Sequence, residues 1–344
     1  MKAVRLYGPR DMRLDEIEAP TSGPGEALIR VRAVGICGSD VHFFKDGGMD
    51  GTSIVFPFIL GHEFAGEIVA LGPETVGPPI GARVAVDPAI PCGQCETCLE
   101  GNINCCPDVR FPASPPIQGV LSEFAVHPAH LCEPLPDSLS FADGAMLEPL
   151  GVAIHALTLA KVQPGNTVAV LGTGPIGLLS IQLALASGAR SVYATEPIEA
   201  RRAMAETAGA TAVCDPSASD PVAWVHEQTG GRGVDVVIEA AWGDETVAHA
   251  VDMAKPAGRV VLVGISARGI TSFPAAPARR KGLTILVSRR MQAVYPRAIA
   301  LLKQGIIDVQ SLVTHRFPLG RTPDAYSLVA SLSDGVGKAM IELS

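Results

Sequence analysis

A glycine-rich turn between a buried strand and a helix constrains the fold of this chain most strongly. The apolar run Thr167–Leu171 is typical of a strand inside a parallel sheet, and it leads into Gly172-Thr173-Gly174-Pro175-Ile176-Gly177 and a helical stretch. Glycines at this spacing allow a tight turn and let the backbone approach a pyrophosphate at the positive end of the helix. Glu196 follows nineteen residues after Gly177, at the end of a second strand, as a dinucleotide-binding fold requires. The alternative is a crossover of the same shape that binds no ligand.

The acid at the end of the second strand predicts which dinucleotide is preferred. Glu196 would accept hydrogen bonds from the adenosine ribose hydroxyls, and its charge would repel a 2′-phosphate. This favours NAD over NADP. Arg201 and Arg202 follow closely, and an arginine can hold a 2′-phosphate, so NADP stays open as the alternative.

The alternation of strands and helices continues to residue 287. Helical segments separate most of the short apolar runs, for example residues 221–228 and 245–254. Parallel strands joined by crossover helices make a doubly wound α/β sheet. Six strands are expected, at residues 167–171, 191–195, 212–214, 234–238, 259–263 and 283–287.

Length and composition set limits on the rest of the architecture. The chain has 344 residues, of which 47% are hydrophobic, and this length suggests about two domains. The formal net charge of −8 gives no electrostatic case for binding nucleic acid. No apolar run reaches the roughly eighteen residues that would span a bilayer, and the N-terminus lacks the apolar core of a signal peptide. We therefore expect a cytoplasmic protein with neither a membrane nor a nucleic-acid partner.

The first 150 residues have a different texture from the alternating region. Apolar and polar side chains alternate over residues 27–32, with basic residues on one face. Similar runs at residues 69–71 and 83–86 are separated by Gly and Pro turns. This pattern predicts a compact antiparallel β-structure with long loops.

Five cysteines crowd into fifteen positions of this region. Cys92, Cys95 and Cys98 are three residues apart, and Cys105 and Cys106 follow. Four thiolates at close spacing can surround a zinc ion with no open position, which is typical of a structural site. The spacing does not decide between Cys105 and Cys106 as the fourth ligand. A run of free surface thiols is the alternative.

A second candidate metal site begins at Gly61-His62-Glu63. An imidazole and a carboxylate between two apolar segments are costly to desolvate unless something pairs them. Cys37 lies upstream in a polar stretch, and thiolate, imidazole and carboxylate are ligands of catalytic zinc, which keeps one position open. The alternative is a hydrogen-bonded His–Glu pair beside an inert cysteine.

Taken together, these motifs resemble the zinc-dependent medium-chain dehydrogenases, and within that family they are most similar to the sorbitol (polyol) dehydrogenases. The resemblance covers essentially the whole chain. It rests on the four-cysteine cluster, the glycine-rich turn and Gly61-His62-Glu63. It also rests on Gly35-Ile36-Cys37-Gly38-Ser39-Asp40-Val41-His42, Phe111–Pro116, Leu147-Glu148-Pro149-Leu150 and Val313–Pro318.

The resemblance implies two domains. A GroES-like, β-rich catalytic domain would comprise residues 1–150 and 291–344, with a cysteine lobe for structural zinc at about residues 88–110. A doubly wound, parallel-sheet Rossmann domain at residues 151–290 would bind NAD.

The resemblance also assigns site residues. It implies two zinc ions per chain: a catalytic ion held by Cys37, His62 and Glu63, with Glu148 reaching it directly or through water, and a structural ion held by Cys92, Cys95, Cys98 and Cys106. Cofactor contacts map onto Gly172, Gly174, Pro175, Ile176, Gly177, Glu196, Arg201, Val263, Gly264, Ile265, Ser288, Arg289 and Arg290.

Two positions depart from the polyol dehydrogenase pattern. Phe43 stands where these enzymes often carry a substrate-facing tyrosine, and Met291 replaces a second tyrosine, although Arg290 beside it is retained. Both changes remove a phenolic hydroxyl from the expected substrate site, which also includes Glu148. Because such groups discriminate strongly between substrates, sorbitol itself becomes an uncertain substrate while the reaction type does not.

The implied activity is the reversible oxidation of a secondary alcohol of a polyol to the ketose, linked to NAD. Ser39 and His42 are spaced to begin a proton relay to solvent, and a surface histidine without this role is the alternative. The rival substrates are other secondary alcohols, such as threonine or 2,3-butanediol. A rival of another class is a non-catalytic scaffold that binds NAD and zinc. The family also implies a homo-oligomer, a dimer or a tetramer. The β-like stretch at residues 270–273 is a candidate surface for it.

Overall fold

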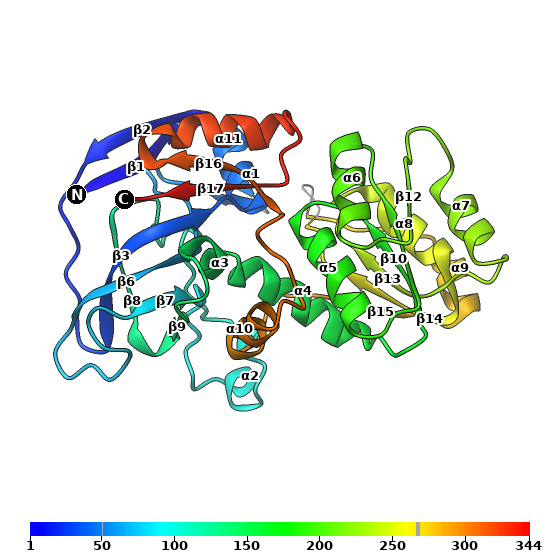
Figure 1. Ribbon diagram of the computed structural model, residues 1–344, viewed down its shortest axis with the longest axis horizontal. Helices are drawn as coiled ribbons and strands as arrows, with labels where there is room; N and C mark the ends of the chain where they lie inside the picture. Colours follow the sequence, from blue (N-terminus) through cyan, green and yellow to red (C-terminus); the bar gives the residue numbers. More distant parts are fainter. Residues whose placement is uncertain (50, 266–268) are drawn as a thin grey trace. The chain divides into compact units, whose positions relative to one another are not determined.

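The computed structural model describes residues 1–49, 51–265 and 269–344, and it divides into two compact units. The C-terminal segment belongs to the same unit as the N-terminus, as the blue and red segments of Figure 1 show. Unit 1 comprises Met1–Pro149, Tyr295–Gly305 and Val309–Ser344, and unit 2 comprises Leu150–Val294 and Ile306–Asp308.

Unit 1 is built around a seven-stranded sheet in which strands from both ends of the chain are neighbours. The order is β16-β17-β3-β6-β7-β9, and β8 also pairs with β3. The pairs formed by the N-terminal strands are antiparallel, as predicted, whereas β16 and β17 form a parallel pair that the sequence pattern did not indicate. The strands are β3 (Glu26–Gly35), β6 (Glu63–Leu71), β7 (Arg83–Val86), β8 (Phe124–Pro128), β9 (Cys132–Pro134), β16 (Val313–Pro318) and β17 (Lys338–Glu342).

Two small sheets and several helices complete unit 1. β1 (Lys2–Gly8) pairs with β2 (Asp11–Glu16), and β4 (Gly48–Met49) pairs with β5 (Thr52–Ser53). The helices are α1 (Gly38–Asp46), α2 (Glu96–Leu99), α3 (Phe141–Ala145), α10 (Tyr295–Lys303) and α11 (Thr322–Ser331), with the 3₁₀ turns η1 (Ile103–Cys105), η2 (Ala129–Leu131) and η3 (Leu319–Arg321).

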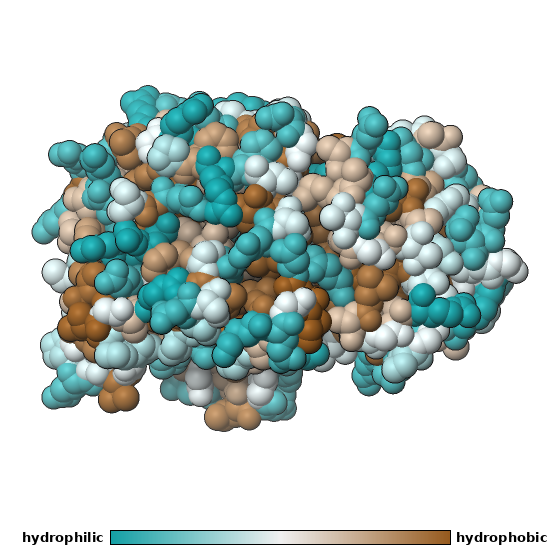
Figure 2. All heavy atoms as spheres, viewed as in Figure 1, coloured by the Kyte–Doolittle hydropathy of each residue, from teal (hydrophilic) through white to brown (hydrophobic). Residues whose placement is uncertain are grey.

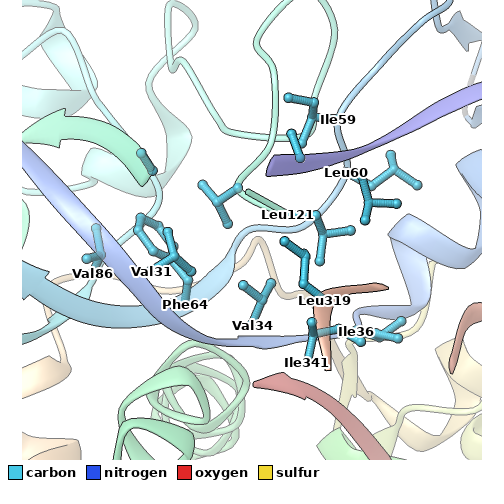
Figure 3. Packing of buried hydrophobic residues seen from close by; sticks show 14 of the residues in the cluster. Val31, Val34, Ile36, Ile59, Leu60, Phe64, Val86, Leu121, Leu319 and Ile341 are labelled. Carbon is cyan, nitrogen blue, oxygen red and sulfur yellow. The ribbon is translucent and has the colours of Figure 1, made fainter. Parts of the chain in front are cut away.

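Alternating apolar side chains of these strands bury the core of unit 1. Val34 on β3, Phe64 on β6 and Val86 on β7 are each at most 1% exposed. Figure 3 shows them near Leu121 and near Ile341 of the C-terminal strand. Because a one-residue slip would turn these side chains out of the core, the packing fixes the register of the strands. It thereby fixes the end of β3 and the start of β6, where the candidate zinc ligands lie.

Unit 2 contains a six-stranded sheet whose strands are the six that the sequence predicts. All its pairs are parallel, in the order β12-β11-β10-β13-β14-β15, which confirms the doubly wound fold. The strands are β10 (Thr167–Leu171), β11 (Ser191–Thr195), β12 (Ala212–Cys214), β13 (Val234–Glu239), β14 (Ala254–Leu262) and β15 (Thr284–Val287). The helices are α4 (Leu147–Ala160), which begins in unit 1, α5 (Pro175–Ala186), α6 (Glu199–Thr207), α7 (Pro221–Gln228), α8 (Asp244–Met253) and α9 (Ala275–Lys281).

The chain order in this sheet reverses at β10. The chain runs from β10 outward to β11 and β12, then returns to β13 on the other side of β10. Ligands of such sheets bind outside the carboxyl ends of the strands at this reversal. The glycine-rich turn follows β10 directly, so it lies at that position.

Across the described ranges, the helices are all too short or too polar to span a membrane.

Candidate active site

Cys37, His62 and Glu63 converge within unit 1. Cys37 follows β3 and precedes α1, whereas His62 and Glu63 stand at the start of β6, the neighbour of β3. One potential ligand atom from each residue lies within 4.8 Å of the other two. His62 is 4% exposed and Glu63 is 1% exposed, while Cys37 is partly exposed. Pairing of β3 with β6 therefore brings together the three side chains that the sequence proposes as zinc ligands.

Asp40 links two of these residues and is itself fully buried. Its Oδ1 lies 3.4 Å from Nδ1 of His62, and its Oδ2 accepts a hydrogen bond of 3.3 Å from the backbone N–H of Cys37. Histidine ligands of metals usually give their other ring N–H to such a carboxylate, which fixes the orientation of the ring. Sequence reasoning did not single out Asp40. Its place three residues after Cys37, as an acid in the first turn of α1, is the signal that could have found it.

Lys338 is a second residue that sequence reasoning missed. Its ammonium group forms an ion pair with Oε2 of Glu63, although the side chain is only 3% exposed. Burial lowers the pKa of Lys338, but the negative charges of Glu63 and Cys37 outweigh it and raise the pKa above its ordinary value. A lone lysine before the apolar run Ala339-Met340-Ile341 was the signal in the sequence.

The electrostatics of the cluster suit a bound cation. Burial lowers the pKa of His62, but Asp40 and Cys37 outweigh it and hold the pKa well above its ordinary value. The surroundings therefore favour positive charge at this imidazole. The sulfur, nitrogen and oxygen donors also match the ligand set of a catalytic zinc ion, so the residues present fit that metal.

Glu148 lies near this cluster without being part of it. It stands in the first turn of α4, is 4% exposed and acts electrostatically on Lys338. Within the part of the chain that the structure describes, the convergent group comprises Cys37, His62 and Glu63 alone. Direct or water-mediated contact of Glu148 with a metal stays a prediction.

The cysteine lobe gathers four thiols into one compact group. Ligand atoms of Cys92, Cys95, Cys98 and Cys106 all lie within 4.8 Å of one another, whereas Cys105 is exposed and outside the group. The backbone N–H of Cys92 points to Sγ of Cys106 at 3.3 Å, and that of Cys95 to Sγ of Cys92 at 3.4 Å. Four cysteine thiolates in such a group fit a closed structural zinc site.

The glycine-rich turn has the geometry expected of a dinucleotide-binding fold. Gly172 has a φ of 83°, which favours glycine, and a Cβ atom there would lie 2.7 Å from Cα of Ala241. Gly174 precedes α5, whose first residue is Pro175. Among the described residues, no side chain caps the N-terminus of this helix, and such a terminus can bind an anion.

Glu196 is already engaged with the turn. Its Oε2 accepts a hydrogen bond of 2.8 Å from the backbone N–H of Thr173, and its Oε1 accepts one of 3.1 Å from that of Ile198. Arg201 extends to the turn as well, because its Nη1 lies 3.8 Å from a Cβ built on Gly174. Arg202 instead pairs with Asp215 at 3.1 Å.

Two family models match this chain. The family described as "Alcohol dehydrogenase GroES-like domain" matches residues 23–137, and the one described as "Zinc-binding dehydrogenase" matches residues 175–304. Sorbitol dehydrogenase of Bacillus subtilis (strain 168) is 35% identical over 341 residues, which are 99% of this chain and 97% of that protein. The chain belongs to the zinc-dependent alcohol dehydrogenase family.

Solved structures of this dehydrogenase family share the whole fold. A protein described as a zinc-binding dehydrogenase from Sinorhizobium meliloti 1021, solved with NADP, has a TM-score of 0.91 and 34% identity, and the match covers 99% of this chain and 98% of that one. The 2R,3R-butanediol dehydrogenase from Bacillus subtilis has a TM-score of 0.89 and 31% identity, with 99% of each chain covered.

The remaining cofactor positions predicted for this dehydrogenase lie where two parallel strands end. Val263, Gly264 and Ile265 follow β14, and Ser288, Arg289 and Arg290 follow β15. In a parallel sheet these ends lie on the same edge as the end of β10, which carries the glycine-rich turn. The backbone N–H of Ser288 donates to the carbonyl of Leu262 at 2.8 Å, which ties the two segments together.

The predicted substrate residues Phe43 and Met291 of this dehydrogenase are buried, whereas the predicted relay residues are partly exposed. Phe43 is 4% exposed within the core of unit 1, and Met291 is 1% exposed against Gly151, where a Cβ atom would overlap its sulfur. His42 on α1 is 18% exposed, with Nδ1 3.8 Å from Oδ2 of Asp46, and Ser39 on the same helix is partly buried. Substrate contact by Phe43 and Met291, and the relay, stay predictions.

Proposed function

We propose that this dehydrogenase reversibly oxidises a secondary alcohol of a polyol, of the sorbitol or xylitol kind, to the ketose with NAD. The convergence of Cys37, His62 and Glu63 carries the proposal, because it provides the donor set of a catalytic zinc site in a chain of this family. An interaction scaffold has no use for this set. Similarity to the sorbitol dehydrogenase of Bacillus subtilis supports the substrate class.

The chain's own residues have distinct tasks in this reaction. Cys37, His62 and Glu63 would hold the zinc, and Asp40 keeps the imidazole oriented through its 3.4 Å contact. Zinc in such a site acts as a Lewis acid that lowers the pKa of a substrate hydroxyl. Ser39 and His42 would pass the released proton towards solvent, since an imidazole can accept a proton on one nitrogen and release one from the other.

Glu196 is our reason for choosing NAD over NADP. Its carboxylate is buried beside the glycine-rich turn, where a 2′-phosphate would meet a fixed negative charge. Glu196→Ala should therefore weaken NAD binding far more than NADP binding, measured by titration of each cofactor. An equal effect on both would refute the ribose role. The NADP-bound relative makes this comparison necessary.

A second candidate substrate class is a smaller secondary alcohol, such as 2,3-butanediol or threonine. The absence of phenolic hydroxyls at Phe43 and Met291 favours it, since polyol enzymes use such groups to bind substrate hydroxyls. The similarity to 2R,3R-butanediol dehydrogenase points the same way.

A substrate panel separates the two candidates. Sorbitol, xylitol, threonine and 2,3-butanediol would each be assayed with NAD and with NADP, and kcat/KM compared. The proposal predicts the highest kcat/KM for a polyol with NAD. A preference for butanediol or threonine would favour the second class, and no turnover of any secondary alcohol by zinc-loaded protein would refute both.

We also propose a homo-oligomer, a dimer or a tetramer, in the cytoplasm. β15 stands at the edge of its sheet, and Val287 on it is 77% exposed. Ile270 is 72% exposed and Phe273 is 37% exposed. Figure 2 shows apolar and polar side chains interspersed over one face of the molecule. An unpaired edge with exposed apolar residues is suited to a second copy. Light scattering would give the oligomeric mass. The absence of disulfides among the described cysteines fits the reducing cytoplasm.

A further inference from the structure

We propose that Lys338 is a built-in counter-charge of the catalytic metal site. In this role its positive charge offsets the repulsion between Glu63 and the neighbouring anions before zinc binds. Bound zinc then compensates the same negative charges. The inference rests on the proposed zinc site at Cys37, His62 and Glu63. It makes Lys338 a positioning residue, which acts on the metal through Glu63.

Three neighbouring strands bring Lys338 to Glu63. β3 lies between β17, which carries the lysine, and β6, which carries the carboxylate (Figure 1). Gly35 on β3 pairs with Glu63 of β6 on one side and with Met340 of β17 on the other. A Cβ atom at Gly35 would overlap Oε2 of Glu63 and lie 3.0 Å from Cε of Lys338. The ion pair therefore occupies space that only a glycine at position 35 leaves open.

The surroundings of Lys338 are anionic and buried. Glu63 and Glu148 are each at most 4% exposed, and Cys37 lies beside Glu63. Glu148 and Cys37 also act on the lysine electrostatically. Buried carboxylates that lose their hydration and repel one another require a nearby positive charge. In the folded chain Lys338 supplies one.

A counter-charge differs measurably from an ion pair that only attaches β17 to the sheet. A purely structural pair would stabilise the zinc-free and the zinc-loaded protein equally. Zinc, however, brings positive charge to the same ligands, so loss of the lysine should harm the zinc-free protein more. By linkage, the affinity for zinc must then rise when the lysine is removed.

The test compares Lys338→Met with Lys255→Met in the full-length protein. Lys255 serves as the matched control, because its Nζ lies 2.7 Å from Oδ1 of Asp235, an ion pair in unit 2. Melting temperatures would be measured with and without zinc, and zinc affinity by competition with a chelator. The four-cysteine site provides an internal reference within each protein.

We expect zinc-free Lys338→Met to lose at least about twice as many degrees of melting temperature as the zinc-loaded variant, with zinc held at least about tenfold more tightly at the Cys37 site. Lys255→Met should lose the same in both states. Equal losses for Lys338→Met in both states, or weaker zinc binding, would overturn the proposal. Wild-type protein that binds zinc only in the cysteine lobe would instead refute the proposed function.

A double variant keeps the test valid if Lys338→Met fails to fold without zinc. Glu63→Gln combined with Lys338→Met removes both charges at nearly constant volume. If the lysine compensates Glu63, the zinc-free double variant should melt higher than zinc-free Lys338→Met. A double variant that folds no better than the single one would show that Lys338 does not compensate Glu63.

Discussion

Mild acid should destabilise this protein through a buried histidine, His127, in the core of unit 1. His127 on β8 is 2% exposed, its Nε2 lies 2.9 Å from the carbonyl oxygen of Asp87, and its ring meets Phe64 edge-on at 6.0 Å. Burial lowers the pKa of His127 from 6.5 to about 4, with a smaller contribution from the positive charges of His130 and Arg110.

The sign follows from proton binding in the two states. Between pH 6.5 and about 4 the unfolded chain binds a proton at His127 that the folded protein does not bind, so stability falls as the pH falls. The full difference in pKa corresponds to about 3 kcal/mol, of which about 2 kcal/mol is reached at pH 5. Above pH 6.5 His127 is mostly neutral in both the folded and the unfolded state, so its contribution to the free energy of unfolding stays nearly constant.

Comparison with His127→Gln isolates this effect from other titrations. A glutamine can still donate to the Asp87 carbonyl but carries no charge at any pH. Urea unfolding of both proteins at pH 7.5 and pH 5, with the same metal content, gives the difference in free energy of unfolding. That difference should move by about 2 kcal/mol in favour of the variant at pH 5. A difference that stays constant with pH would refute the assignment of a buried, neutral histidine.

Two further substitutions test the metal sites. Asp40→Asn should weaken zinc binding at the Cys37 site by about 10- to 100-fold, because the imidazole of His62 loses a charged partner, and unchanged affinity in chelator competition would contradict this role. The Cys106→Ser variant should lose the lobe zinc, whereas the neighbouring Cys105→Ser variant should keep it. Equal zinc contents in the two variants would show that Cys106 is not the fourth ligand.

Motifs whose residues are close together in sequence were predictable. The glycine-rich turn and the six parallel strands follow from short apolar runs and fixed spacings, and the sheet confirms them. The cysteine spacing indicated a metal site but could not choose between Cys105 and Cys106. Only folding of the loop turns Cys106 towards Cys92 and leaves Cys105 exposed.

The partners of the zinc ligands depend on pairing between distant strands. Lys338 contacts Glu63 because β17 and β6 flank β3, and no local pattern at either residue contains that information. Asp40 was within a recognised motif, yet its contact with His62 requires β3 and β6 to pair first. The parallel pairing of β16 with β17 was likewise unpredictable from the alternation of each strand alone.

Cys37, His62 and Glu63 are proposed to hold the zinc ion that serves catalysis. Zinc analysis of wild-type protein and of Cys37→Ser, with NADH binding as a check on folding, tests it most directly. We expect two zinc ions per wild-type chain and one per Cys37→Ser chain, with NADH binding intact and turnover abolished. A Cys37→Ser protein that keeps two zinc ions, or that still turns over an alcohol, would contradict it.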